Sequence, residues 1–220
     1  MRVQRLRIGF GRGAQLRFIT HLDLMRFWER ALRRAEVDVA YSEGFSPHAQ
    51  ISLAAPLPIG VTSRGELMDI FLATKMTADS FADALVPQLP PDLCINSVTE
   101  VPLTLPSIQS QMRAAEYEVS LPRDLDQAAL QEQITELLAR DEIPWKQQRE
   151  KDVKSYDLRP LILTLGISAT ASAESLVMRL RADNEATGRP DQVIAVLGLP
   201  AGSPIERTRL LLSGEEWTQA

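Results

Sequence analysis

The order of its short elements is the feature that most constrains how this chain folds. The order strand, helix, strand, strand, helix, strand occurs in the first half and recurs, with weaker signals, in the second. Leu6, Ile8 and Phe10 alternate with polar or small residues, which predicts a half-buried strand. Thr20 is a predicted N-cap, with Asp23 three positions on, for a helix that runs to about Glu36.

Two such units predict an α+β fold made of two tandem ferredoxin-like (β-α-β-β-α-β) halves with antiparallel sheets. We expect the first half at 1–103 and the second at 114–213, joined by a linker at 104–113, because Pro102 and Pro106 punctuate this stretch. An extended segment is expected at 145–153. This fold hosts many functions and by itself indicates none.

Three glycines near the N-terminus, Gly9, Gly11 and Gly13, are spaced like part of a phosphate-binding loop. Neither a lysine–serine pair nor a helix follows them directly, so we predict a bend at 11–13 with extended structure resuming at 16–18. Gly65 predicts a turn before a strand at 67–72.

Sulfur and imidazole ligands are scarce. The chain has one cysteine, Cys94, and two histidines, His21 and His48. An iron–sulfur cluster of the radical SAM type needs about three cysteines, and a closed structural zinc site needs four ligands. We therefore expect no metal or cofactor on this chain, and predict Cys94 to be a small buried side chain.

Hydrophobicity gives no sign of a membrane or an export route. The longest apolar stretches fall well short of the ~20 residues of a spanning helix, and the N-terminus lacks the apolar region of a signal peptide. We expect a cytoplasmic protein without a membrane partner.

Charge is distributed unevenly along the chain. The net charge is −5, but residues 1–64 contain ten arginines and five acids, whereas the remainder has 14 basic and 24 acidic residues. Such asymmetry indicates either a face that binds a polyanion or a helix with many solvated arginines, and both remain open.

Several residues of the first helix are candidates for binding an anion. The backbone N–H groups of a helix start favour negative charge, and His21 and Asp23 lie there, with Arg17 before them and Arg26 one turn on. Arg26, Arg30, Arg33 and Arg34 form a second row that could contact phosphates. The structural alternatives are that Asp23 caps the helix and that the arginines pair with Glu29 and Glu36.

Ser42, Phe45 and His48 lie on a connection with mixed composition. His48 could act as a general acid–base or could hold a turn in shape. Phe45, with Trp28 and Trp145, could stack on a base, although core packing is the alternative for each. Arg159, in the segment Asp157–Pro160, is a candidate for a second anion contact, and a salt bridge between the two halves is the favoured alternative.

The clusters THLDLMRFWERALRR and YSEGFSPHAQISLAAPLPIGV resemble the radical-SAM-linked domain family. The similar residues include Arg17-Phe18, His21-Leu22-Asp23 and Gly44-Phe45, and Asp157-Leu158-Arg159-Pro160-Leu161 resembles a shorter signature in the second half. Ser46 and Ala49 depart from the pattern, where asparagine and proline are common. Members of this family are encoded beside, or fused to, cobalamin-binding radical SAM proteins.

The resemblance implies a radical SAM protein as partner, which would carry the iron–sulfur cluster and SAM, with cobalamin a further candidate. We expect a binding module that presents a substrate, RNA being favoured, to that enzyme. The alternative is a metal-independent enzyme similar to the CRISPR-type RNA-processing endonucleases, with His21 or His48 as the general acid–base. The C-terminal glycine-rich loop of those nucleases is missing, which favours the module.

Overall fold

The computed structural model describes residues 1–148, 153–169 and 174–214. The chain divides into two compact units, Met1–Met112 and Arg113–Ala220. Both are α+β, and antiparallel strand pairs occur in each of them, as the sequence predicts. Of the extended segment expected at 145–153, residues 149–152 lie outside the described residues.

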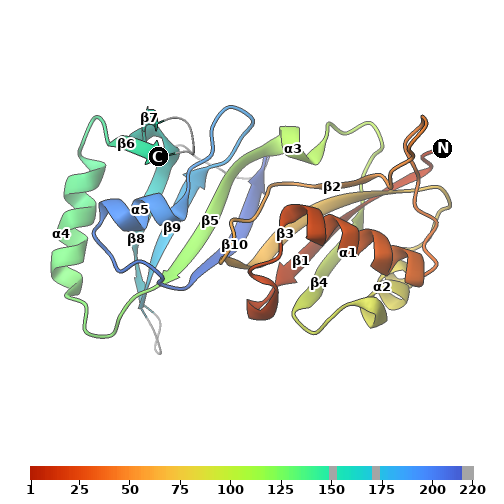
Figure 1. The fold of residues 1–220 in the computed structure, drawn as a ribbon, viewed down its shortest axis with the longest axis horizontal. Coiled ribbons are helices and arrows are strands. Elements are labelled where there is room, and N and C mark those ends of the chain that lie inside the picture. The colour runs from red at the N-terminus through yellow and green to blue at the C-terminus, as the bar shows by residue number, and fades with distance from the viewer. Residues whose placement is uncertain (149–152, 170–173, 215–220) are drawn as a thin grey trace. The chain divides into compact units, whose positions relative to one another are not determined.

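The first unit has a sheet with strand order β4-β1-β3, and β2 also pairs with β3. Figure 1 shows α1 and α2 beside this sheet. Its elements are β1 Gln4–Arg12, α1 His21–Arg34, β2 Ile51–Leu53, β3 Thr62–Leu72, α2 Ala78–Leu85, β4 Leu93–Glu100 and α3 Ile108–Gln111.

The hydrophobic core of this unit lies between one face of the sheet and the two longer helices. The alternating side chains of β1 enter it, and Leu6 and Ile8 lie opposite Ile70 and Met68 of β3. From α1, the fully buried Trp28 packs edge-on against Phe10, with ring centroids 5.2 Å apart. Aromatic pairs favour this edge-to-face geometry.

The opposite face of β1, predicted to face solvent, is covered. Arg5 is 2% exposed and Asp69 of β3 is 0% exposed, and they form an ion pair. Arg7 donates to the same carboxylate over 2.8 Å. The Arg5 guanidinium also donates to the backbone oxygens of Leu105 and Pro106, over 2.7 and 2.8 Å.

These contacts change the interpretation of the predicted linker. Residues 104–112 fall within the first unit, and they include α3 and the first residue of β5. The prolines predict a linker because proline disfavours regular secondary structure. A segment without regular structure can still pack against a domain, and here its main-chain oxygens bind the buried Arg5 guanidinium.

The glycines of β1 are used for packing. The predicted bend at 11–13 is wrong, because β1 continues to Arg12 and pairs with β4. A Cβ atom on Gly11 would lie 2.7 Å from Cys94 Sγ and 3.3 Å from the Ser63 oxygen, so a side chain at this position would require its neighbours to move. The extended structure expected at 16–18 is also wrong, since a 3-10 turn spans Ala14–Leu16.

Two further predictions in this unit fail. Gly65 lies inside β3 and not at a turn before it. Cys94 is exposed and not buried, since its strand β4 is at the end of the sheet order of this unit.

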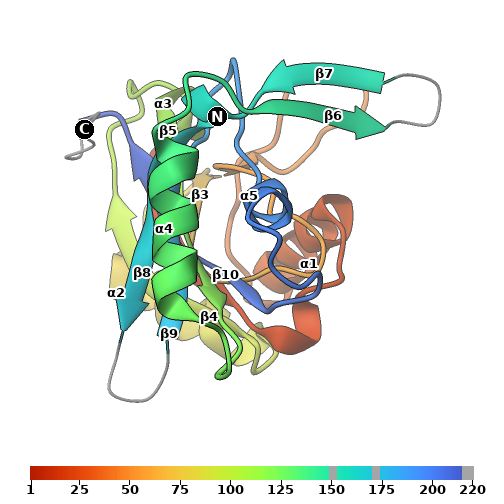
Figure 2. The ribbon, with the colours of Figure 1, turned by 90° about the vertical axis from the view of Figure 1, so that its left-hand side faces the viewer.

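The second unit has a sheet with strand order β10-β5-β9-β8. In Figure 2, α4 runs along β8, and β6 and β7 form a hairpin that projects from the rest of this unit. Its elements are β5 Met112–Ser120, α4 Gln127–Leu138, β6 Pro144–Gln148, β7 Val153–Asp157, β8 Ile162–Ala169, β9 Glu174–Arg181, α5 Pro190–Val196 and β10 Ile205–Leu212. In the described parts of both units, no helix combines the length and hydrophobicity that crossing a membrane requires.

Replacing Thr20 with alanine is expected to destabilise the first unit by about 1 kcal/mol. The Thr20 hydroxyl oxygen accepts from the backbone N–H of Asp23 at 3.2 Å, and this bond satisfies a donor at the start of α1. Urea denaturation followed by circular dichroism would measure the loss. Thr20→Ser keeps the acceptor and should remain within about 0.5 kcal/mol of the wild type; an equal loss in both variants would contradict the capping role.

Candidate functional site

The exposed face of α1 carries a row of arginines with unequal bonding. Arg34 donates to the side chain and backbone of Gln88, over 3.1 and 2.9 Å. Arg26 forms an exposed ion pair with Asp23 at 3.6 Å. Arg30 and Arg33 are exposed, and neither makes a hydrogen bond or ion pair within the part of the chain that the structure describes.

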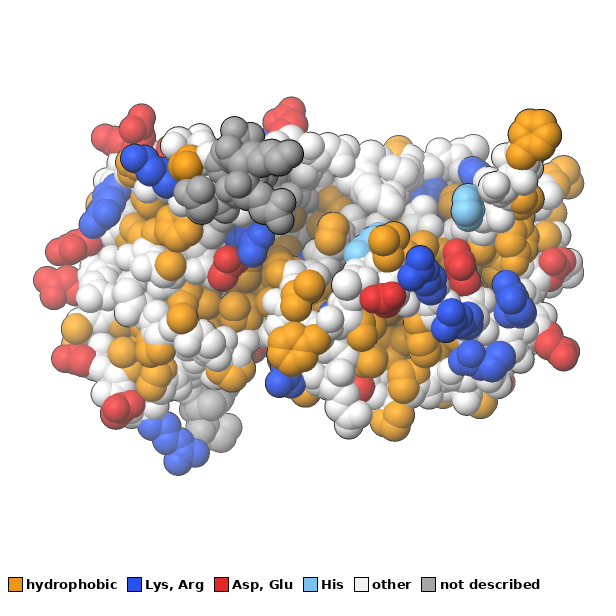
Figure 3. Space-filling model, in the orientation of Figure 1, with side chains coloured by type: hydrophobic (Ala, Val, Ile, Leu, Met, Phe, Trp, Pro, Cys, Tyr) orange, Lys and Arg blue, Asp and Glu red, His pale blue; other side chains and the backbone are white. Residues whose placement is uncertain are grey.

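The predicted pairing of this row with Glu29 and Glu36 is therefore not observed in the described residues. Figure 3 shows Lys and Arg side chains gathered over α1. Arg26, Arg30 and Arg33 follow one another at helical spacings of four and three residues, so they cover about 10 Å along the axis. We call these three residues the arginine row.

The start of α1 is already occupied by the chain's own carboxylate. The Thr20 hydroxyl donates to Asp23 Oδ2 at 2.7 Å, and the Arg26 guanidinium lies beside the same carboxylate. Arg17 turns back to donate to the Ala14 oxygen at 2.9 Å, with its guanidinium 4.7 Å from the centre of the Phe18 ring. His21 is exposed. Thr20 is thus the capping residue of α1, and the Asp23 carboxylate lies at this helix start as the partner of Thr20 and Arg26.

The segment from Tyr41 to Ala49 forms a tight loop whose ends pair with each other. Ser42 holds it, since its hydroxyl oxygen accepts from the His48 N–H at 3.0 Å and its N–H donates to the His48 oxygen at 2.9 Å. His48 therefore shapes the turn through its backbone, and its side chain is exposed. Phe45 is fully exposed in this loop, contrary to the core-packing alternative.

The two histidines are not brought together. His21 begins α1, whereas His48 lies on the Tyr41–Ala49 loop, and the pale-blue histidine patches are separate on the face in Figure 3.

A hollow of about 320 Å³ lies between α1 and the base of the Tyr41–Ala49 loop. Glu36 adopts a left-handed conformation (φ 53°) and ends the helix, after which the Val37 N–H bonds back to the Leu32 oxygen. The chain then runs along β3, where Val39 pairs with Leu72. We call this cavity the α1 hollow; its lining is Glu29, Leu32, Arg33, Glu36, Val37, Asp38, Val39, Tyr41 and Ala49.

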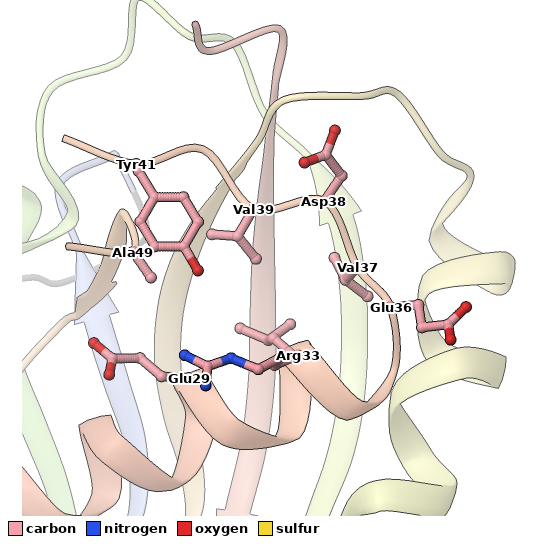
Figure 4. Close-up of a pocket in the computed structure, with 9 residues that line it drawn as sticks. Glu29, Arg33, Glu36, Val37, Asp38, Val39, Tyr41 and Ala49 are labelled. Atoms are coloured by element: carbon pink, nitrogen blue, oxygen red, sulfur yellow. The ribbon is translucent and has the colours of Figure 1, made fainter. Parts of the chain in front are cut away.

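Charged groups divide between the two ends of the α1 hollow. In Figure 4 the side chains of Glu29, Arg33 and Tyr41 gather at one end, whereas the carboxylates of Glu36 and Asp38 point away from it. The Asp38 carboxylate accepts from the Thr74 hydroxyl at 2.6 Å. Arg33 therefore belongs both to the arginine row and to this cavity.

Arg159, the candidate in the second unit, is committed to its own surroundings. It is half-buried, and its guanidinium donates to the backbone oxygens of Leu138 and Ile162, over 3.2 and 3.1 Å. Asp157 accepts from the N–H groups of Ile143 and Arg159. Asp157 and Arg159 thus stabilise the turn between β7 and β8. The Arg159 guanidinium already binds backbone oxygens, which does not favour the predicted anion contact.

The family model described as "Uncharacterized protein conserved in bacteria (DUF2344)" matches residues 5–190. The chain belongs to this family. The match includes the arginine row, the Tyr41–Ala49 loop and Arg159, so every candidate site residue lies within the family domain.

Other comparisons add little to the family assignment. Among curated proteins, none matches the chain. One similar solved chain is in the "Crystal Structure of a Cbf5-Nop10-Gar1 Complex", with a TM-score of 0.47 and 11% identity over 94% of this chain and 50% of that chain. This family member therefore spans about half the length of the solved chain.

Two residues of the α1 hollow were missed as site residues. Glu29 was predicted only as a partner of the arginines, and Tyr41 only as part of a motif. The four-residue spacing of Glu29 and Arg33 could have indicated that both side chains lie on one face of the helix. No local signal could have placed Tyr41 beside them, because its position depends on tertiary folding. In the described ranges, no group of three or more His, Cys, Asp and Glu side chains is placed to hold a metal ion.

Proposed function

We propose that this chain is a module that binds RNA through α1 and presents it to a radical SAM enzyme. The observation that carries the proposal is the pair of exposed guanidinium groups, Arg30 and Arg33, that have no partner in the described part of the chain. Solvated charges without internal partners remain available for phosphates, and each phosphate contact releases counterions.

The enzyme partner is inferred from the motif resemblance. In this proposal the iron–sulfur cluster, SAM and any cobalamin are held by the partner, since one cysteine cannot supply the thiolates of a cluster. The module's own residues would bind and orient the RNA, and the radical chemistry would take place on the other chain.

For the fold, we infer that each unit is a ferredoxin-like half. The strand order β4-β1-β3-β2 of the first unit supports this inference, as does β10-β5-β9-β8 in the second, where the β6–β7 hairpin is an insertion. In both orders the first and third strands of the β-α-β-β-α-β unit lie at the centre.

Binding to a labelled single-stranded RNA should weaken steeply with salt. Each neutralised phosphate of a single strand contributes a slope of about −0.7 to log Kobs against log salt. Arg30→Gln and Arg33→Gln should each make the slope shallower by about 0.7. Fluorescence anisotropy with a uridine oligonucleotide between 50 and 200 mM KCl would measure it.

Arg34→Gln is the matched control, because it removes the same charge from the same helix but from a guanidinium already bound to Gln88. Its slope should stay close to that of the wild type. No binding at low salt would refute an RNA role, and cleavage without metal that His21→Ala abolishes would favour the endonuclease hypothesis.

The partnership has a separate test. The tagged chain, purified from its source cells, should retain a radical SAM protein that mass spectrometry identifies and that carries the absorbance of an iron–sulfur cluster. Its absence, in cells that express such a protein, would leave an RNA-binding module without this partner.

A further inference from the structure

The α1 hollow contains two oppositely charged groups that do not bind each other. Glu29 and Arg33 are one helical turn apart and line the same end, where a direct ion pair would be the usual arrangement. Yet within the described residues neither side chain has an ion pair or a hydrogen bond. Glu29 is half-buried and lines the cavity, so its carboxylate is available there to a ligand.

The remaining lining suits a flat ring. Leu32, Val37 and Val39 are buried apolar residues of the lining. Tyr41 is 52% exposed, and its aromatic side chain lies at the same end of the cavity as Glu29 and Arg33. A cavity of about 320 Å³ is within the range of small-ligand sites. Aromatic side chains bind unpaired bases by stacking.

We propose that the α1 hollow binds one unpaired guanine base of the RNA, a proposal that rests on the RNA-binding function above. Guanine offers two adjacent donors, N1–H and the 2-amino group, which match the two oxygens of the Glu29 carboxylate. It also offers the acceptors O6 and N7, which a guanidinium such as that of Arg33 binds.

Other bases complement this pair of charges less well. Adenine has an acceptor at N1 where guanine has a donor, and it has no 2-amino group. Cytosine presents no ring N–H donor on its pairing edge, and uracil presents one N–H between two carbonyl oxygens. A carboxylate facing these edges would lose one or both hydrogen bonds, so the α1 hollow discriminates for guanine. Because Arg33 also belongs to the arginine row, the base would enter from a backbone that runs along α1.

The test compares labelled eight-residue uridine RNAs with guanosine, inosine, adenosine or uridine at one central position, by anisotropy with the full chain. The guanosine RNA should bind about 5- to 150-fold more tightly than the all-uridine RNA, the range for one well-bonded base. Inosine lacks the 2-amino group and should fall between them. Glu29→Gln should abolish the guanosine preference, so that the guanosine and all-uridine RNAs bind this variant equally.

Glu36→Gln is the matched control, because Glu36 also lines the cavity but its carboxylate points away from Arg33 and Tyr41; it should keep the preference. Equal binding of all four RNAs would overturn the guanine site while leaving the proposed function intact, whereas failure of every RNA to bind would overturn both. If free guanosine monophosphate bound as tightly as the guanosine RNA, the cavity would be a nucleotide site and not an RNA contact.

Discussion

Replacing Asp69 with asparagine is expected to lower the free energy of unfolding of the first unit by about 3–5 kcal/mol. Asp69 is fully buried, and its carboxylate accepts hydrogen bonds from both Arg5 and Arg7. Asparagine keeps the size but removes the negative charge, so Arg5, 2% exposed, would remain a buried cation without a counterion. Urea denaturation followed by tryptophan fluorescence would measure the loss, since Trp28 is buried in this unit.

Asp83→Asn removes an exposed carboxylate from α2 and should change the stability by less than about 0.5 kcal/mol. Adding Arg5→Met to Asp69→Asn removes the stranded cation and should recover part of the lost stability, because hydrophobic side chains can replace buried ion pairs. A small effect of Asp69→Asn alone would show that water reaches this pair, contrary to its burial.

Trp28→Ala is the second substitution with a large expected effect, again about 3–5 kcal/mol, because it leaves a cavity at the centre of the core. The indole of Trp28 contacts the rings of Phe10 and Phe27 edge-on, with centroids 5.2 and 6.0 Å away. Thermal unfolding followed by circular dichroism would detect the loss without relying on the removed fluorophore.

Trp28→Phe should have a smaller effect, about 1–2 kcal/mol. The buried indole N–H of Trp28 has no hydrogen-bond partner among the described residues, so phenylalanine removes an unsatisfied donor together with some volume. If Trp28→Phe destabilised the unit as strongly as Trp28→Ala, the indole N–H would have a partner that the geometry does not reveal.

Local signals in the sequence predicted much of the first unit. Thr20 caps α1 as expected, and the alternation of Leu6, Ile8 and Phe10 identifies the strand and its core-facing side. Both depend on neighbours within a few residues, where backbone geometry follows from side-chain chemistry. The α+β class follows from the order of such elements.

What the sequence could not indicate are contacts between distant segments. Arg5 and Asp69 are 64 positions apart, and the carbonyl groups that bind Arg5 are about a hundred positions away. A strand that alternates apolar and charged residues indicates one buried face, so the covering of the second face was missed. The glycines of β1 likewise predict a bend when only their neighbours in sequence are considered, although in the fold they allow β4 to pack closely.

The candidate site also has one part that local sequence signals predict and one part that depends on tertiary folding. The arginine row was predicted because helical spacing alone puts these residues on one face. The α1 hollow was not, because it depends on the path of the chain after Glu36, which brings Tyr41 to the same end of the cavity as Arg33. Arg159 was a plausible anion ligand as a sequence motif, but the turn that contains it uses its guanidinium for backbone oxygens.

The hydrogen bonds from Arg5 to the backbone of Leu105 and Pro106 constrain the length of the segment after β4 more than its amino-acid sequence. The guanidinium recognises only main-chain oxygen atoms, which every amino acid possesses, so the identity of those two residues is almost unconstrained by it. Their distance along the chain from β4 is constrained, because an insertion or a deletion would shift both oxygens away from the buried Arg5 guanidinium. We therefore expect the amino acids of the segment between β4 and Pro106 to vary among related sequences while its length stays the same.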